Sequence, residues 1–253
     1  MLSQSKLTGK VSKFDRPLLD APITYRVVFS KTGNLQYFSH LDLQRTWQRV
    51  LVRASIPMWY TQGFNPHAKI VFGVPLPVGS EGLEEMVDLR VDRVISSAEM
   101  KDQLNAELTG EMQVSEVYIP TTSFSDIAFA TYEITVSSGE GSLTAETAAA
   151  VNALFAPGGE PLMMSKRSKS GDKEIDIIPL IHALKATVDC HGLMHIRATL
   201  RAGNSENLGA EYIIKAMRER LGILPDADPT AWYRILRLGF HSEAGVERGI
   251  WFR

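Results

Sequence analysis

Residues 23–54, with the sequence ITYRVVFSKTGNLQYFSHLDLQRTWQRVLVRA, contain the clearest pattern for predicting the fold. Large apolar residues stand at every second position from Ile23 to Phe29, and a period of two predicts a β-strand. Turn-forming residues follow at 31–34. Ser39 stands three residues before Asp42, which is the spacing of a capping box and predicts the start of a helix. The stretch therefore predicts a strand, a turn and a helix.

The predicted helix has two distinct sides. Apolar residues at 43, 47, 50, 51 and 54 share one side and are expected in the core, and Pro57 marks the end of the helix. Arg45, Arg49 and Arg53 are spaced by four and share another side. This spacing suits contacts with a phosphate backbone, although a solvated helix face has the same pattern.

Outward from this helix, the first half continues with three strands and one more helix. Strands are expected near 68–74, 87–91 and 112–119, and a helix from Ser96 to about Leu108. The order strand-helix-strand-strand-helix-strand is the ferredoxin-like pattern. Residues 23–120 are therefore predicted to form an α+β domain with an antiparallel sheet.

The second half repeats this plan more loosely. We expect a strand around Ile134, a helix at 144–155, hairpins at 162–178 and 186–201, a helix at 210–221 and a strand at 232–238. Residues 129–240 thus form a second ferredoxin-like α+β domain, elaborated by one extra hairpin. The domain boundary is expected within 121–130, and residues 1–22 and 241–253 are expected to be tails.

Composition narrows the class of protein. Of 253 residues, 44% are hydrophobic and 22% are charged, which is close to the average of soluble globular proteins. No apolar run is long enough for a membrane helix, and the N-terminus lacks the apolar core of a signal peptide. Cys190 is the single cysteine, so no internal disulfide forms and the cytoplasm is the expected location. A cysteine-ligated zinc or iron–sulfur site within this chain is excluded, and no metal site is predicted.

The net charge of −2 hides a segregation of charge along the chain. Residues 1–70 carry a balance of +7, whereas residues 71–120 carry −7 and residues 121–160 carry −5. Such asymmetry indicates a basic region that faces a polyanion such as nucleic acid, and an acidic region elsewhere.

The loop Gly63-Phe64-Asn65-Pro66-His67 is the most distinctive stretch. Gly63 permits unusual backbone angles, and Asn65 before a proline is restricted to extended ones. His67 is then expected at the entrance of a strand with Lys69 on the same face, where the two could hold a phosphate or a carboxylate. A rigid turn with a solvated histidine is the alternative. Phe64 is predicted to plug the core rather than to stack on a base.

Two further groups could carry chemistry. Capping explains Asp42 but not His40, so His40 and His67 are candidate general acid and base residues. The second basic cluster lies across the hairpin predicted at 162–178 and consists of Lys166, Arg167, Lys169 and Lys173. A basic hairpin suits a nucleic-acid groove, yet edge strands also carry lysine to prevent aggregation.

Several motifs resemble one bacterial family. They are Phe38-Ser39-His40-Leu41-Asp42-Leu43, Gln62-Gly63-Phe64-Asn65-Pro66-His67, Pro75-Leu76-Pro77-Val78-Gly79, Lys173-Glu174-Ile175-Asp176-Ile177 and Leu200-Arg201-Ala202-Gly203. Over most of residues 23–240 the chain resembles the radical-SAM-linked proteins, a domain of unknown function. The resemblance implies a partner, a radical SAM protein with a cobalamin-binding-type domain. S-adenosylmethionine, an iron–sulfur cluster and possible cobalamin are then expected on that partner, and no cofactor in this chain.

Three hypotheses of function follow. The leading one is an accessory protein that binds structured RNA, such as tRNA or rRNA, for modification by the radical SAM partner. In it, the three arginines and the basic hairpin hold phosphates, while His40, Asn65 and His67 line a polar pocket. The second is an acid/base enzyme that uses His40 and His67 on RNA or a small substrate. The third is an interaction module that docks on the partner through its acidic stretch, without RNA.

Overall fold

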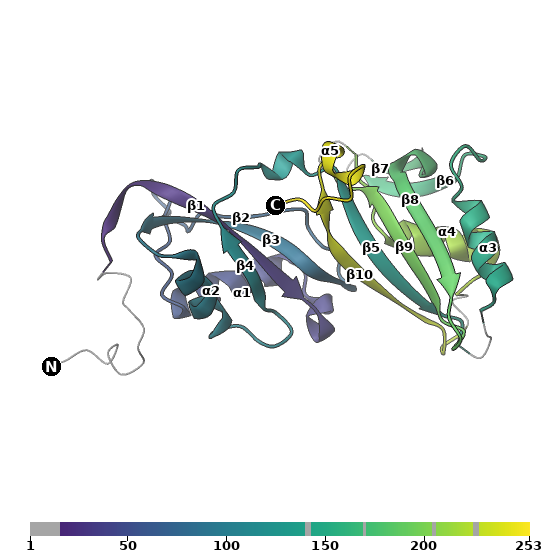
Figure 1. Cartoon of the computed structure of the whole chain (residues 1–253), viewed down its shortest axis with the longest axis horizontal. Coiled ribbons are helices and arrows are strands. Elements are labelled where there is room, and N and C mark those ends of the chain that lie inside the picture. Colours follow the sequence, from purple (N-terminus) through teal and green to yellow (C-terminus); the bar gives the residue numbers. More distant parts are fainter. Residues whose placement is uncertain (1–15, 140–142, 169–170, 204–205, 225–227) are drawn as a thin grey trace. The chain divides into compact units, whose positions relative to one another are not determined.

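The computed structural model describes residues 16–139, 143–168, 171–203, 206–224 and 228–253, and the chain divides into two compact units. The first unit ends at Phe124 and includes Arg253, and the second is Ser125–Phe252. Each unit contains an antiparallel sheet and helices packed on it (Figure 1). Within the described part of the chain, no helix has the length and apolar character needed to cross a membrane.

The first unit has the ferredoxin-like order of elements. They are β1 (Leu18–Lys31), α1 (His40–Arg53), β2 (Ile70–Phe72), β3 (Ser80–Arg93), α2 (Ser97–Asn105) and β4 (Val114–Tyr118). The strand order is β4-β1-β3-β2, and every neighbouring pair is antiparallel. The predicted fold class is therefore confirmed for this half of the chain.

The core of this unit lies between the sheet and its two helices. Alternate residues of β1 face the helices, and the Phe29 ring meets Trp47 of α1 edge-on at 4.9 Å. Trp47 is fully buried, and the other residues predicted on its side of the helix are buried as well. Because a Trp→Ala change in a core costs about 3–5 kcal/mol, this contact is a main source of the unit's stability.

Some boundaries differ from the prediction. The helix predicted to reach Pro57 ends at Arg53, because Ser55 adopts a left-handed backbone with φ of 56°. The strand expected at 68–74 is only β2, whereas β3 begins at Ser80, well before the alternation at 87–91. The second strand along the chain is thus short, with 3 residues, whereas the third is as long as β1, with 14 residues.

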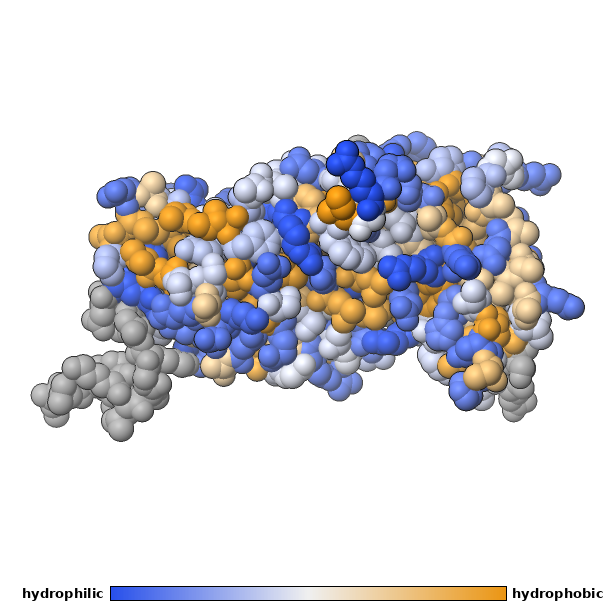
Figure 2. Space-filling model, viewed as in Figure 1, coloured by the Kyte–Doolittle hydropathy of each residue, from blue (hydrophilic) through white to orange (hydrophobic). Residues whose placement is uncertain are grey.

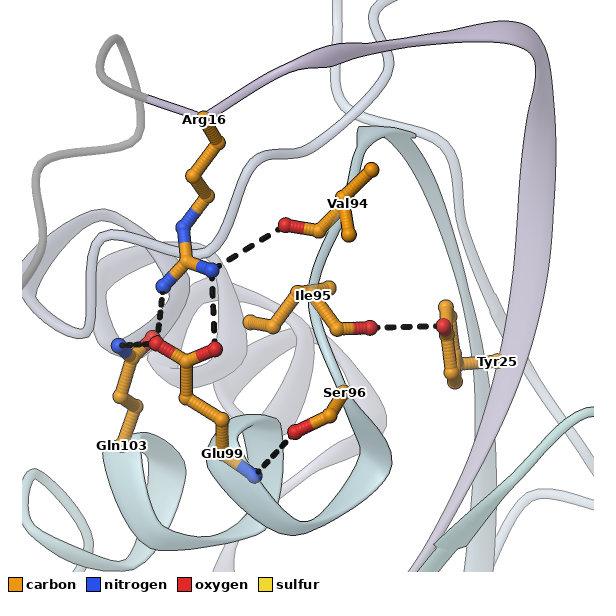
Figure 3. Close-up of polar contacts among 7 residues, drawn as sticks. All are labelled: Arg16, Tyr25, Val94, Ile95, Ser96, Glu99 and Gln103. Carbon is orange, nitrogen blue, oxygen red and sulfur yellow. Dashed lines mark hydrogen bonds and ion pairs between the residues drawn. The ribbon is translucent and has the colours of Figure 1, made fainter.

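A buried arginine fastens the start of β1 to α2. Arg16 Nη1 and Nη2 donate to Glu99 Oε2 and Oε1 at 3.0 and 2.5 Å, and Nη1 also donates to the Val94 carbonyl at 3.2 Å (Figure 3). The hydrogen bonds from Arg16 hold the pKa of Glu99 below its ordinary value. Residues 1–22 were predicted to be a tail. Residues 1–15 lie outside the described part, but residues 16–22 are ordered because Arg16 is bound and β1 begins at Leu18.

The second unit repeats the plan with an addition. Its elements are β5 (Phe129–Ser137), α3 (Ala145–Leu154), β6 (Met163–Ser168), β7 (Gly171–Asp176), β8 (Ile181–Val188), β9 (Met194–Arg201), α4 (Glu211–Leu221), β10 (Trp232–His241) and α5 (Glu243–Val246). The main sheet has the order β10-β5-β9-β8, which matches the first unit strand for strand. The hairpin predicted at 162–178 is present as β6–β7, and it forms a separate two-stranded sheet.

The inserted hairpin is fastened to α4. Lys215 Nζ donates to the Ser165 carbonyl and Arg220 Nη2 to the Met163 carbonyl, both at 3.2 Å. Met164, between these two, is buried. The hairpin is therefore packed on the unit by its backbone and one apolar side chain.

The C-terminal residues are folded, contrary to the tail predicted at 241–253. His241 ends β10, and its Nδ1 lies 2.8 Å from the Ile250 carbonyl while its ring stacks on Trp251. The Phe252 N–H donates to the Phe240 carbonyl at 2.7 Å, and the Phe252 side chain is buried. The prediction is wrong because this segment buries aromatic side chains despite its glycines and charges.

Candidate functional site

The N-terminus of α1 is capped as the sequence predicts. Ser39 Oγ accepts from the Asp42 N–H at 3.2 Å, and Asp42 Oδ2 accepts from the Ser39 N–H and hydroxyl at 3.2 and 2.6 Å. These hydrogen bonds, with a smaller contribution from Arg45, lower the pKa of the Asp42 carboxyl. Asp42 is thus occupied by the helix cap.

The two candidate histidines have different surroundings. The His40 ring, at the first position of α1, meets Phe72 edge-on at 5.3 Å. His67 Nδ1 lies 3.0 Å from Thr61 Oγ1, which also accepts from the His67 N–H at 3.1 Å. Both histidines are exposed, and Asn65, also exposed, contributes its carbonyl at 3.3 Å from His67 Nδ1.

His40 and His67 lie at opposite ends of α1. His67 lines a cavity together with Val52, in the last turn of the helix. A rise of about 1.5 Å per residue places Val52 about 18 Å along the axis from His40. General acid and base residues that act on one substrate must both be within hydrogen-bond reach of it. The structure therefore does not bring the two imidazoles into one pocket.

The cavity beside His67 is mainly apolar. On the face of the molecule shown in Figure 2, hydrophobic residues (orange) are interspersed with hydrophilic ones (blue). The cavity volume is about 280 Å³, and its lining residues are Gln48, Leu51, Val52, Ile56, Met58, Tyr60, His67 and Ala68. The loop that follows Tyr60 is closed at its neck by the bonds between Thr61 and His67, and Gly63 has a φ of 139°. Phe64 consequently projects into solvent and is fully exposed. The prediction that Phe64 plugs the core is wrong, because the closed neck directs the tip of the loop away from the core.

The three arginines spaced by four along α1 differ in their partners. Arg45 and Arg49 are exposed, and neither forms an ion pair with another described residue. Arg53 instead donates from Nε to Glu107 Oε2 and from Nη2 to the Glu107 carbonyl, both at 3.1 Å. Of the three arginines, Arg45 and Arg49 are therefore the two that form no ion pair with another described residue, although Arg45 acts on the Asp42 carboxylate. By helical spacing, Arg45 and Arg49 lie on the same side of α1 as Gln48 and Val52, which line the apolar cavity with His67. We call these five residues, with Phe64 of the loop before His67, the α1–loop surface.

A second cavity lies on the opposite face of the same sheet. Its volume is about 260 Å³, and its lining residues are Thr24, Lys69, Val71, Asp88, Arg90, Ser123 and Phe124. These strand positions alternate with core residues and hence point away from the helices. Lys69 was predicted to share a face with His67, but the two line different cavities.

Arg90 and Phe124 are not among the residues predicted from the sequence. The signal for Arg90 was present, since it stands between the core residues Leu89 and Val91 and therefore faces the other side of the sheet. Phe124 had no such signal. Its ring is placed by Arg26, whose guanidinium carbon lies 4.1 Å from the ring centre.

Arg26 is fully buried and structural. Its Nε and Nη2 donate to Asp88 Oδ1 and Oδ2 at 2.8 and 3.0 Å, and Nη1 donates to Thr122 Oγ1 at 2.9 Å. Both carboxylate oxygens of Asp88 thus accept hydrogen bonds from Arg26. The bond from Arg26 to Thr122 holds the residues before Phe124 against the sheet.

The basic hairpin is less available than predicted. Lys166 Nζ donates to the Asn207 carbonyl at 2.6 Å and to Asn207 Oδ1 at 2.9 Å. Lys173 is exposed opposite it, and Arg167 is in register with Asp172. Lys169 lies outside the described residues. Of the two lysines of the cluster that the structure describes, Lys173 alone extends into solvent without such a partner.

The second unit has a larger cavity, of about 490 Å³, with a different charge pattern. Arg201 lines it together with Asp126, Glu206 and Glu243. Arg201 pairs with Glu243 through Nη1 and with Glu206 through Nε at 3.8 Å, and it covers the Phe129 ring at 4.3 Å. The arginine that lines this cavity is thus neutralised by carboxylates.

Comparison with models of protein families matches the chain to one family. The model of the family described as "Uncharacterized protein conserved in bacteria (DUF2344)" matches residues 24–209. That description gives neither a partner nor a reaction. Among curated proteins, none matches the chain. A crystal structure of a candidate glycine cleavage system transcriptional repressor is similar at 10% identity and a TM-score of 0.24, over 88% of this chain and 100% of the other. A likeness this weak supports no statement about function.

Proposed function

The chain belongs to the bacterial DUF2344 family, and on that premise we propose that it is an accessory protein that binds structured RNA. The observation that carries the proposal is the full exposure of Phe64, in the loop that leads to His67, together with two exposed arginines of α1 that form no ion pair with another described residue. Exposed aromatic rings stack on unpaired bases, and arginines bind the phosphates on either side. The α1–loop surface contains both components.

The apolar cavity adds a feature that a solvated helix face lacks. Val52 and Tyr60 are exposed at its border, and His67 contributes an imidazole to its lining. A base that leaves its stack can bury an apolar face there while its edge bonds to a polar side chain. This combination favours loops and bulges of a folded RNA over a regular duplex.

A radical SAM protein with a cobalamin-binding-type domain is the partner we propose, on the resemblance of the motifs around His40 and His67. This chain would present the RNA, while S-adenosylmethionine, the iron–sulfur cluster and cobalamin would be held by the partner. Co-purification of the two proteins, with and without ribonuclease, tests this part separately. A complex that survives ribonuclease is expected, and failure of the two purified proteins to associate would contradict it.

RNA binding is tested with total tRNA and rRNA across a salt series. An Arg45→Gln/Arg49→Gln variant should bind more weakly and with a shallower salt dependence. The log–log slope should fall by about 0.7 to 0.9 for each phosphate that the variant no longer neutralises. Phe64→Ala should weaken binding by about 1–3 kcal/mol with the slope unchanged, because stacking is not ionic.

Arg53→Gln is the control, since it removes one positive charge from the same helix at a position already paired with Glu107. It should leave the salt slope unchanged. A loss of affinity in Arg53→Gln that is half of the loss in the Arg45→Gln/Arg49→Gln variant would reduce the effect to net charge, because the variant removes two charges. No binding by the wild-type protein at low salt would overturn the proposal.

A further inference from the structure

Two cations face each other on the helix-free side of the first sheet. Ile70 of β2 is in register with Leu89 of β3, so Lys69 and Arg90 stand directly opposite one another. The Arg90 N–H donates to the Lys69 carbonyl at 3.2 Å, which confirms this pairing. Like charges directly opposite in an antiparallel pair destabilise a sheet.

No described carboxylate compensates this pair. Asp88 lines the same cavity, but both of its oxygens accept from Arg26. Neither Lys69 nor Arg90 has an ion pair among the described residues, and Arg90 Nε is buried without an acceptor there. The cavity therefore carries two positive charges that nothing in the described protein neutralises.

Aromatic rings hold this arrangement in place. The Arg90 guanidinium lies over the Trp59 ring, with 4.9 Å between its carbon and the ring centre, which restricts its position. Phe124 forms a wall of the cavity, and Arg26 covers one face of its ring. Val71, which is 41% exposed, adds apolar surface. A cationic pair is thus fixed next to a flat apolar wall.

From these features we infer that the cavity binds one nucleotide, with its phosphate on Lys69 and Arg90 and its base against Phe124 and Val71. A phosphate would relieve the repulsion between the two cations, and arginine binds phosphate through two parallel hydrogen bonds. The volume of about 260 Å³ lies just below the usual range of small-ligand pockets, so the cavity takes no more than one nucleotide and excludes a helix. The nucleotide is either free or an unpaired residue of an RNA.

This site goes beyond the proposed function, because it lies on the opposite side of the sheet from the α1–loop surface. Binding is measured by calorimetry and by the fluorescence of the tryptophans, which include Trp59. The probes are the four nucleoside monophosphates, the corresponding nucleosides, inorganic phosphate and a single-stranded oligoribonucleotide. The variants are Lys69→Gln/Arg90→Gln and, as a control, Arg53→Gln/Lys185→Gln, which removes two exposed cations elsewhere in the protein.

Wild type and control should bind the monophosphates, and the Lys69→Gln/Arg90→Gln variant should bind at least tenfold more weakly. Nucleosides should not bind, and inorganic phosphate should compete. Similar affinities for monophosphate and oligonucleotide identify a free nucleotide as the ligand, and binding of the oligonucleotide alone identifies RNA. Both results support the site.

The inference is overturned if the Lys69→Gln/Arg90→Gln variant binds the monophosphates and the oligonucleotide as tightly as the control does. It is also overturned if no probe binds to the wild type at low salt. The Arg45→Gln/Arg49→Gln variant separates the two proposals, since it should lose structured RNA and retain the nucleotide. Thermal unfolding confirms folding, and Lys69→Gln should not destabilise the unit because it removes a repulsion.

Discussion

The two units share one fold, and each has a cavity lined by an arginine, but the arginines differ in their partners. In the first unit, Arg90 stands opposite Lys69 and has no carboxylate partner among the described residues. In the second, Arg201 is paired with Glu206 and Glu243. The second cavity is the larger, at about 490 against 260 Å³. The first cavity can therefore attract an anion because its arginine has no carboxylate partner among the described residues, and not because of its size.

The largest effect is expected where an arginine of the first unit is structural. Asp88→Asn leaves the buried Arg26 without its carboxylate, and breaking such a pair costs about 3–5 kcal/mol. Glu243→Gln, which removes one exposed partner of Arg201, should cost less than about 1 kcal/mol. Urea denaturation of the two variants measures both values. Equal losses would show that the two units do not differ in how their arginines are used.

A smaller effect is expected from the pair that fastens β1 to α2. Arg16→Gln removes charged hydrogen bonds to a partly exposed Glu99, which should cost about 1–2 kcal/mol at neutral pH. Because the pKa of Glu99 is lowered in the folded state, its contribution is present above its ordinary pKa of 4.5 and is lost as the pH falls through the folded value. The stability difference between wild type and Glu99→Gln should therefore shrink below pH 4.5. A difference that is constant from pH 7 to pH 3 would contradict this assignment.

The difference in charge between the two cavities can be exchanged by substitution. In a Lys69→Gln/Arg90→Gln background, Glu206→Gln/Glu243→Gln should free Arg201 and raise the affinity for inorganic phosphate about tenfold, or about 1.4 kcal/mol. Calorimetry detects the change. Unchanged affinity would mean that pairing is not what closes the second cavity to anions.

The smallest effect on stability is expected at the loop. Phe64→Ala should change the free energy of unfolding by less than about 0.5 kcal/mol, since the ring is fully exposed. Trp47→Ala in the adjacent helix should cost about 3–5 kcal/mol. Denaturation of both variants tests whether Phe64 is retained for binding. A loss above about 1 kcal/mol at Phe64 would assign it a structural role.

The sequence predicted most of the fold because hydrophobic periodicity and capping are local. Ser39 and Asp42 indicated the start of α1, and alternation indicated β1 and β5. The candidate site was harder to predict, because it depends on contacts between residues that are far apart in the chain. The bond from Arg53 to Glu107, the pairing of Lys69 with Arg90 and the placement of Phe124 by Arg26 each join residues far apart in the chain. The closed neck that exposes Phe64 depends on a side-chain bond that no periodicity reveals.

The projecting loop also gives the protein a position for controlled cleavage. Exposed loop tips are the preferred sites of proteolysis, and a chymotrypsin-type protease cuts after aromatic residues such as Phe64. The fragments on either side of the cut contain β1 with α1 and β2 with β3, which share one core. The cleaved protein should therefore remain folded. A ligand bound to the α1–loop surface should slow cleavage after Phe64, so the cleavage rate reports binding there.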